Sequence, residues 1–253
     1  MTTTLDRPAP PRRRAPWLLL GVVGLVALAL VALAVLVNAI ASPGRAAHVV
    51  TAARGDRDAA TVDVVSGASV VTVRTADIGD DLYRVSTPDD RADVPRVSTQ
   101  DDRVTVALAA DDPDGVGGRT AVDLVLNRGV AWTVRISGGA DEARLDLREG
   151  RVAGVDLASG VSTVELQLPA PDGTVTVTET GGVSRLAVHV PPAVAARVTV
   201  AGGAGTADIN GTVHSGVPAT TTFAPPDWDS AADRYDVRLV GGVSGFSLDQ
   251  LSR

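Results

Sequence analysis

The residues that could bind a metal ion or act as a catalytic base are few in this chain. It has three histidines, His48, His189 and His214, and no cysteine. No two histidines stand at the short spacing that metal ligands on one element share. His189 lies between Val188 and Val190, and this alternation predicts a solvated side chain on a strand. We therefore predict no metal site, no cofactor and no catalytic residue.

Acid-rich and glycine-rich turns are the next candidates for chemistry. Asp111, Asp112 and Asp114 could hold a calcium ion, but the distant bidentate acid of an EF-hand loop is missing. The segment 202–208 approaches the calcium-binding nonapeptide of β-rolls, yet its acid is misplaced and the pattern does not recur. A nucleophile elbow and a phosphate-binding loop are also absent from the sequence. These patterns favour solvated turns and predict that the protein is not an enzyme.

One aromatic residue is flanked by two acids near the end of the chain. Asp227 and Asp229 stand on either side of Trp228, a pattern seen at carbohydrate sites. There an indole offers a flat apolar face and the acids accept hydrogen bonds. Alternatively, Trp228 covers the end of a β domain. These three residues are the candidate contact with a ligand or partner.

The elements that would position these residues follow a repeat that is clearest over residues 137–213. The turn glycines Gly139, Gly160, Gly182 and Gly203 are 21, 22 and 21 residues apart. Between the turns, apolar residues occupy every second position, which is typical of strands with one buried face. A fixed step of this size predicts stacked units. We expect an all-β, solenoid-like or toast-rack-like stack of short strands, with a β-sandwich as the alternative.

The same pattern extends over a predicted ectodomain at residues 61–251. Residues 127–129 suggest a hairpin between two of its strands. Residues 215–234 interrupt the step and predict a loop that folds Trp228 over the open end of the stack. Residues 235–251 then return as a last rung.

The N-terminal region predicts a single membrane anchor. Residues 1–16 form a basic tail with four arginines, and residues 17–40 contain no charge. A helix of 24 residues is about 36 Å long, enough to cross a hydrocarbon core of about 30 Å. The arginines predict a cytoplasmic N-terminus, a juxtamembrane linker at 41–60 and an extracellular C-terminal domain at the plasma membrane. The alternative is a signal peptide cleaved after Ala41.

The charge balance limits the partners. The net charge is −7, and 29 of the 30 acids but only 19 of the 23 basic residues follow the hydrophobic stretch. An acidic ectodomain argues against nucleic acid as a partner. All the basic residues are arginine, which together with abundant Ala, Val and Gly hints at a GC-rich bacterium.

Residues 60–251 resemble a known group of bacterial domains. The segments 130–134 and 137–139, followed by Leu-x-Leu strands that open with Gly-Gly-Val-Ser, are similar to bacterial "putative adhesin" or toast-rack β domains. They also resemble the C-terminal β domain of LiaF-type cell-wall-stress proteins. The resemblance implies a membrane-associated, non-enzymatic β module that is sometimes tied to envelope stress. One anchor helix is fewer than LiaF-type proteins usually have.

These observations favour a single-pass envelope protein whose β-repeat module contacts an envelope protein or a wall component. An adhesin-like or carbohydrate-binding surface protein that uses the Trp228 loop is the alternative. That alternative predicts an exposed indole. An enzyme would need two carboxylates facing each other across a cleft, and the sequence nominates no such pair.

Overall fold

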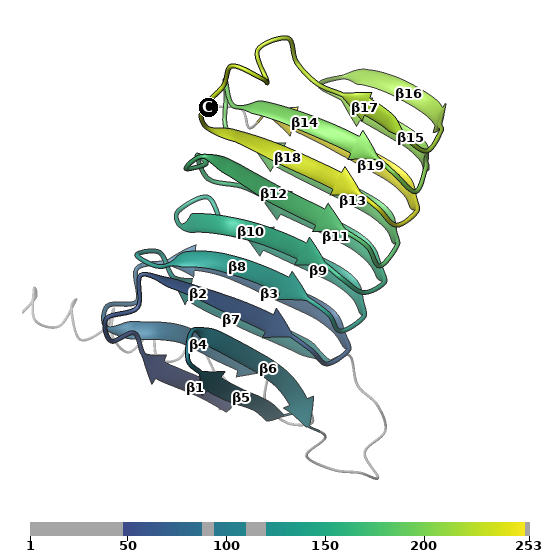
Figure 1. The fold of residues 1–253 in the computed structure, drawn as a ribbon. Coiled ribbons are helices and arrows are strands. Elements are labelled where there is room, and N and C mark those ends of the chain that lie inside the picture. The colour runs from purple at the N-terminus through teal and green to yellow at the C-terminus, as the bar shows by residue number, and fades with distance from the viewer. Residues whose placement is uncertain (1–47, 88–93, 110–119, 251–253) are drawn as a thin grey trace, which may run out of the picture. The chain divides into compact units, whose positions relative to one another are not determined.

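The computed structural model describes residues 48–87, 94–109 and 120–250, which belong to one compact unit, 45–253. These residues form two mixed β-sheets and no helix, so the all-β prediction is confirmed (Figure 1). Within these ranges no helix is long and apolar enough to cross a bilayer. The predicted tail 1–16, membrane helix 17–40 and acidic turn 111–114 lie outside the described residues.

The two sheets face each other and enclose the apolar core. Sheet A has ten strands, in the spatial order β1 (His48–Ala53), β4 (Asp81–Thr87), β7 (Ala121–Asn127), β3 (Ala68–Ala76), β9 (Ala140–Asp146), β11 (Val161–Gln167), β13 (Val183–Val190), β19 (Val243–Gln250), β15 (Ala204–Ile209) and β16 (Thr212–Val217). Sheet B has nine, in the order β17 (Thr221–Phe223), β14 (Ala195–Val200), β18 (Arg234–Leu239), β12 (Thr174–Glu179), β10 (Arg151–Leu157), β8 (Ala131–Ile136), β2 (Ala59–Val64), β6 (Arg103–Ala109) and β5 (Val94–Gln100).

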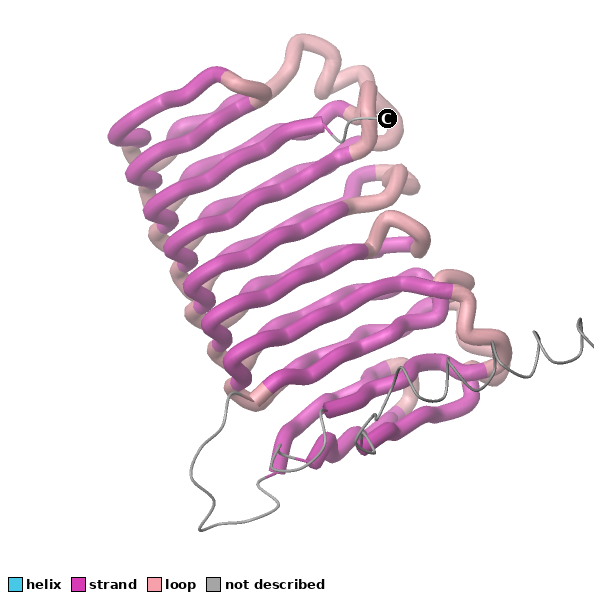
Figure 2. The backbone as a smooth tube through the Cα atoms, turned by 180° about the vertical axis from the view of Figure 1, so that it is seen from behind, coloured by secondary structure: helices cyan, strands magenta, loops and turns pink. Residues whose placement is uncertain are grey.

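Successive strands from β8 to β15 alternate between the two sheets, so each turn of chain adds one strand to each (Figure 2). Val161 pairs in parallel with Ala140 on one side and with Val183 on the other, which reproduces the predicted steps of 21 and 22 residues. Leu166, Val188 and Val200 are fully buried, as their alternation requires. The repeat therefore predicted the strands and the buried face correctly.

The spatial order differs from the chain order at both ends. The pair β18–β19 was expected as the last rung, but it lies between β12–β13 and β14–β15. Likewise, β2–β3 lies between β6–β7 and β8–β9. The expectation of a terminal rung is wrong. Residue alternation specifies which face a strand buries, but it does not specify which strand pairs with it.

Three shorter segments also differ from expectation. Residues 48–53, assigned to a linker, form β1 on the edge of sheet A. Residues 127–129 join β7 in sheet A to β8 in sheet B and are therefore not a hairpin. The predicted capping loop contains part of β16 and all of β17, which pair antiparallel with β15 and β14 at the end of each sheet. Such end strands cover an exposed sheet edge.

The corner between β12 and β13 shows why glycine recurs at the corners of the stack. Gly182 has a φ of +79°, a conformation that a side chain opposes. At Gly181, a Cβ atom would collide with the backbone of Ser159 in the preceding corner. Gly139 and Gly160, in contrast, do not have a positive φ. Close approach between stacked corners, as well as turn conformation, therefore demands glycine.

One corner carries a buried acid in an otherwise aliphatic row. Glu179 is fully buried and pairs in register with Leu157 and Leu239. Its Oε1 accepts a hydrogen bond of 2.5 Å from the Gly182 amide, whereas Oε2 has no partner. Burial raises the pKa of Glu179, and the amides of Gly182 and Gly241 partly oppose that rise.

Candidate functional site

The indole of Trp228 is held inside the C-terminal loop. It is only 8% exposed, and its Nε1 donates to the Tyr235 carbonyl at 3.2 Å. The guanidinium carbon atoms of Arg197 and Arg234 lie 3.6 Å and 4.2 Å from the ring centroid. These cation–π contacts occupy the ring that a sugar would need. The expectation of an exposed indole is therefore wrong, and Trp228 serves as an anchor for the loop.

The two acids that flank Trp228 in the sequence differ from it in their surroundings. Asp227 and Asp229 are both exposed, and the Asp229 carbonyl accepts a hydrogen bond from Arg234. Asp227 lines a cleft of about 500 Å³ between the two sheets, which Trp228 and Asp229 do not line. The structure thus separates the three predicted contact residues.

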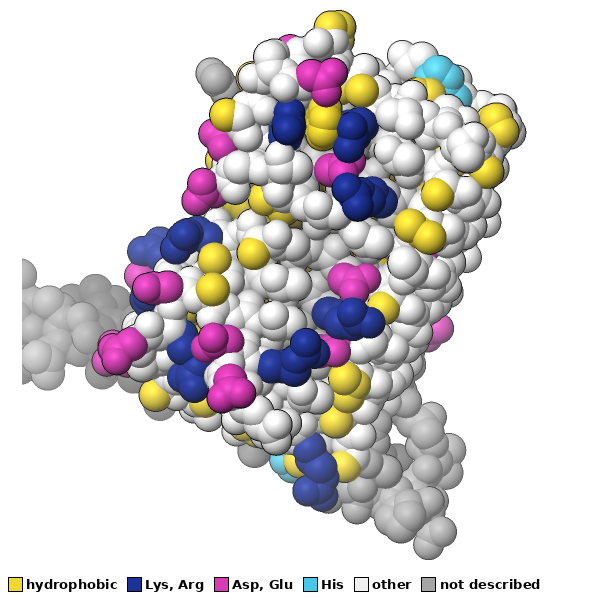
Figure 3. Space-filling view, in the orientation of Figure 1, with side chains coloured by type: hydrophobic (Ala, Val, Ile, Leu, Met, Phe, Trp, Pro, Cys, Tyr) yellow, Lys and Arg dark blue, Asp and Glu magenta, His cyan; other side chains and the backbone are white. Residues whose placement is uncertain are grey.

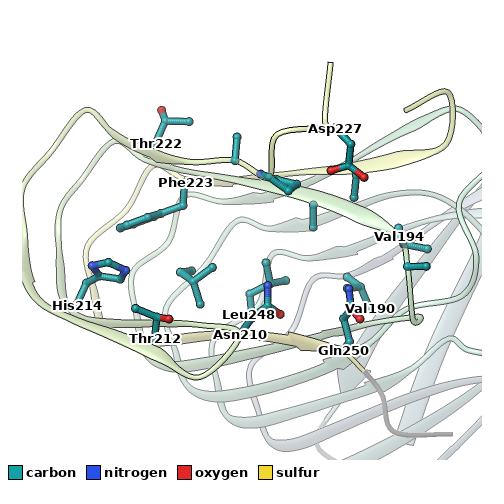
Figure 4. A pocket seen from close by; sticks show the side chains of 16 residues that line it. Val190, Val194, Asn210, Thr212, His214, Thr222, Phe223, Asp227, Leu248 and Gln250 are labelled. Carbon is teal, nitrogen blue, oxygen red and sulfur yellow. The ribbon is translucent and has the colours of Figure 1, made fainter. Parts of the chain in front are cut away.

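This cleft lies at the end of the stack that carries β16 and β17 (Figure 4). Apolar side chains line it from both sides: Phe223 and Val194 on one, Val190 and Leu248 on the other. Its polar lining includes Asn210, Thr212, His214, Asp227 and Gln250.

The ionisable residues of the cleft do not form an acid–base pair. His214 stacks against Phe223, with ring centroids 4.7 Å apart. Asp227 lies toward the opposite end of the lining, as Figure 4 shows. General acid–base catalysis needs both groups within hydrogen-bond reach of one reacting centre. The cleft can hold an apolar group but offers no such arrangement.

The outer face of sheet B carries a network centred on a buried acid. Asp236 is 1% exposed and accepts hydrogen bonds from Arg197 at 3.0 Å and from Arg238 at 2.7 Å. Burial favours a higher pKa for Asp236, but the two guanidinium groups outweigh it and lower that pKa. This carboxylate stays ionised and fixes both arginines on the surface.

A second network lies farther along the same face. Arg135 bridges Asp156 at 2.6 Å and Asp63 at 3.6 Å, and Arg103 approaches Asp63 at 3.8 Å. Ser137 donates a hydrogen bond to Asp63. These contacts hold the side chains of four adjacent strands, β10, β8, β2 and β6, in one arrangement.

A shallow hollow of about 440 Å³ adjoins the second network. It is lined by Thr133, Gly154, Thr176 and Thr178, and also by Arg135 and Asp156 of that network. The hollow forms because Gly154 places no side chain in the outward row that Thr133 and Thr176 continue. In Figure 3 the charged side chains of this face gather in groups, with uncharged surface between them.

The histidines do not converge on one another. His189 lies on the outer side of sheet A, as predicted, and its Nδ1 is 2.6 Å from Asp249. His48 belongs to β1, at the opposite end of sheet A from β16, which carries His214. Within the described residues, no three His, Cys, Asp or Glu side chains gather where they could hold a metal ion.

The arginine networks were missed at the level of sequence, although a local signal existed. Arg234, Asp236 and Arg238 alternate along β18, so they must share one face of the strand. Their partners Arg197 and Trp228 come from other segments, and only the inserted position of β18 brings them together.

Comparison with known proteins gives a likeness of fold. No protein-family model matches the chain, and no curated protein matches it in sequence. The structure of a "putative cell adhesion protein" from Clostridium sporogenes is similar with a TM-score of 0.58 and 11% identity, covering 81% of this chain and 99% of that protein. A "putative adhesin" from Bacteroides fragilis covers 80% and 97% at 9% identity, with a TM-score of 0.25 that supports no argument. The first comparison shows that this chain shares the fold of that Clostridium protein.

Proposed function

We propose that the protein is a single-pass envelope protein that presents a non-enzymatic β-solenoid as an interaction module outside the plasma membrane. In this proposal each solenoid turn contributes one strand to each sheet. Residues 17–40 anchor the chain, the N-terminus is cytoplasmic, and the partner is an envelope protein or a wall component.

The observation that carries the proposal is the fixed surface of sheet B. Its outward side chains form rows in register across parallel strands, and the Asp236 and Asp63 networks hold them in place. A surface whose side chains are already ordered loses little entropy on binding. The uncharged stretch 17–40 and the arginines before it support the membrane anchor.

The setting of this function comes from the resemblance alone. LiaF-type proteins act in envelope stress, and we include envelope stress or assembly in the proposal on that basis. The alternative is an adhesin-like surface protein, which the fold likeness to the Clostridium protein favours. Sugar binding by Trp228 is not favoured, since Arg197 and Arg234 lie against its ring.

The proposal is tested by topology mapping of the full chain in bacterial cells. Alkaline phosphatase fused after Arg253 should be active, and the chain should stay in the membrane fraction after alkaline carbonate washing. Recovery of the chain in the wash would contradict the anchor, and an inactive phosphatase fusion would contradict the orientation. Adhesion assays with cells that carry or lack the protein then separate an adhesin from a module that acts within the envelope.

A further inference from the structure

The two sheets carry charges of opposite sign, although the chain as a whole is acidic. The strands of sheet B carry seven arginines, Arg96, Arg103, Arg135, Arg151, Arg197, Arg234 and Arg238, against four acids, Asp63, Asp156, Glu179 and Asp236. The strands of sheet A carry four arginines, Arg74, Arg84, Arg144 and Arg185, against eight acids, Asp81, Asp123, Asp141, Glu142, Asp146, Glu165, Asp208 and Asp249. The net charge of the chain is therefore negative even though the strands of sheet B carry more arginines than acids.

Three of the four acids of sheet B are less accessible than its arginines, and the side chain of the fourth, Asp156, is 29% exposed. The accessible surface is therefore more basic than the residue counts alone indicate. Glu179 points into the core and is fully buried, and Asp63 and Asp236 are 8% and 1% exposed. The side chains of Arg135 and Arg238, in contrast, are 41% and 54% exposed. An anion that approaches this face meets guanidinium groups first.

Several donors on this face remain available. Arg197 binds Asp236 through Nε, and its terminal nitrogens make no hydrogen bond to another described residue. The hydroxyls of Thr133, Thr176 and Thr178 likewise bond to no other described residue. Guanidinium groups recognise carboxylates, and threonine hydroxyls can donate to or accept from sugar hydroxyls.

Two arginines of this face lie on one line that crosses the strands, with the Asp156 carboxylate and Thr178 between them. Arg135, Asp156, Thr178 and Arg238 occupy one row in register, on four adjacent strands. At a strand spacing of about 4.8 Å, the two arginines are roughly 14 Å apart along the row. The hollow at Gly154 adjoins this row, and Arg135, Asp156 and Thr178 of the row line it.

We propose that this face of sheet B binds a linear acidic polysaccharide that runs across the strands. Its carboxylates would contact Arg135 and Arg238, and its hydroxyls would contact the threonines around the Gly154 hollow. The inference rests on the proposed interaction function and names its ligand class.

Other polymers fit this face less well. The exposed large hydrophobic side chains in the described residues are Val49, Val65, Val213 and Val240, and none lies on a strand of sheet B. Protein interfaces depend on buried aromatic or apolar anchors, and single-stranded nucleic acids need aromatic rings for stacking. Alternating hydroxyl and guanidinium groups suit a hydroxylated anion.

The test measures binding of full-length protein, solubilised in a non-ionic detergent, to immobilised polygalacturonate. Dextran is the neutral control, and poly-L-glutamate is the polyanion without sugar hydroxyls. We expect binding to polygalacturonate that weakens with added salt, and little binding to either control. Absence of polygalacturonate binding, or equal binding to dextran or poly-L-glutamate, would overturn the inference.

Substitution at the hollow locates the site. A Cβ at Gly154 would meet the Thr176 carbonyl at 3.5 Å, an ordinary contact, so side chains fit there. Gly154→Glu should weaken polygalacturonate binding by about tenfold or more through like-charge repulsion. Gly154→Ser and Thr163→Glu, the latter on sheet A, should leave binding within about twofold. Equal losses in Gly154→Glu and Thr163→Glu, or no loss in Gly154→Glu, would refute the site.

Circular dichroism of each variant checks that a loss of binding is not a loss of folding. A Gly154→Glu chain that unfolds is replaced by Thr176→Glu on the neighbouring strand, for which the same tenfold loss is expected. The binding assay uses purified protein and does not depend on cellular location. Failure here with a correct topology result would therefore refute the ligand and leave the envelope proposal standing.

Discussion

Removal of the last strand pair tests the out-of-order packing most directly. A stop codon in place of Arg234 deletes β18 and β19, which lie between β12–β13 and β14–β15. If this pair were a terminal rung, its loss would shorten the stack and leave the remainder packed. Because it is internal, its loss should release residues 195–223 from the rest.

The size of the effect follows from the side chains that would be lost. Six large apolar side chains of the pair are 3% exposed or less: Tyr235, Val237, Leu239, Val243, Phe246 and Leu248. At about 1.5–3 kcal/mol each, their burial contributes roughly 9–18 kcal/mol. Whole domains are stable by only about 5–15 kcal/mol. The strands beyond the gap, β14 to β17, should therefore not stay folded.

Limited proteolysis with mass spectrometry, together with thermal unfolding by circular dichroism, measures the outcome. We expect cleavage within residues 195–223 and a lower unfolding midpoint. A chain that ends after Gln250 retains both strands and is the matched control. Protection of 195–223 in the truncated chain, with an unchanged midpoint, would refute the internal position of β18–β19.

Three further predictions concern single residues. Because burial raises the pKa of Glu179, its contribution to stability is complete below about pH 4.5 and is lost as the pH rises through the raised value. Glu179→Gln should therefore gain roughly 1–2 kcal/mol at pH 7 and less at pH 4 in urea unfolding, and a gain independent of pH would contradict this reasoning. Asp236→Asn should lose about 1–3 kcal/mol at pH 7, since it weakens three charged hydrogen bonds from two arginines. Because the pKa of Asp236 is lowered, its contribution to stability is present above about pH 3.8 and is lost as the pH falls through the lowered pKa. The stability deficit of Asp236→Asn should therefore shrink in acid. A deficit that does not change with pH would argue against the ion pairs. Gly181→Ala should cost about 3 kcal/mol or more, because its Cβ has no room, whereas Gly154→Ala should change stability by less than about 1 kcal/mol; equal urea midpoints would refute the close corner packing.

The strands and their buried faces could be predicted from the sequence because alternation is a local property. Val188 and Val200 were expected in the core from two-residue periodicity, and both are fully buried. The 21- and 22-residue steps also gave the correct register for β9, β11 and β13. The neighbours of each strand could not be predicted, since the pairs ending in β13, β15 and β19 present similar aliphatic patterns to the core.

The candidate site was harder to predict because its parts come from distant segments. Trp228 was singled out in the sequence, but its surroundings depend on Arg197, 31 positions earlier. The contrast in charge between the sheets could not be seen either. It appears only when each strand is assigned to its sheet, which requires the spatial order.

The interleaved ends restrict how proteins with this architecture can change in length. Among the described strands, those from β8 to β13 are stacked in the order in which they follow one another along the chain, and the strands at both ends are not. A tandem duplication of 21 or 22 residues in this central part would add one strand to each sheet and would leave the order of the other strands unchanged. The same duplication near either end would separate strands that must reach across a neighbour. Longer and shorter homologues should therefore differ by whole strand pairs at the centre. The two ends, where the spatial order of the strands differs from the chain order, should keep their length.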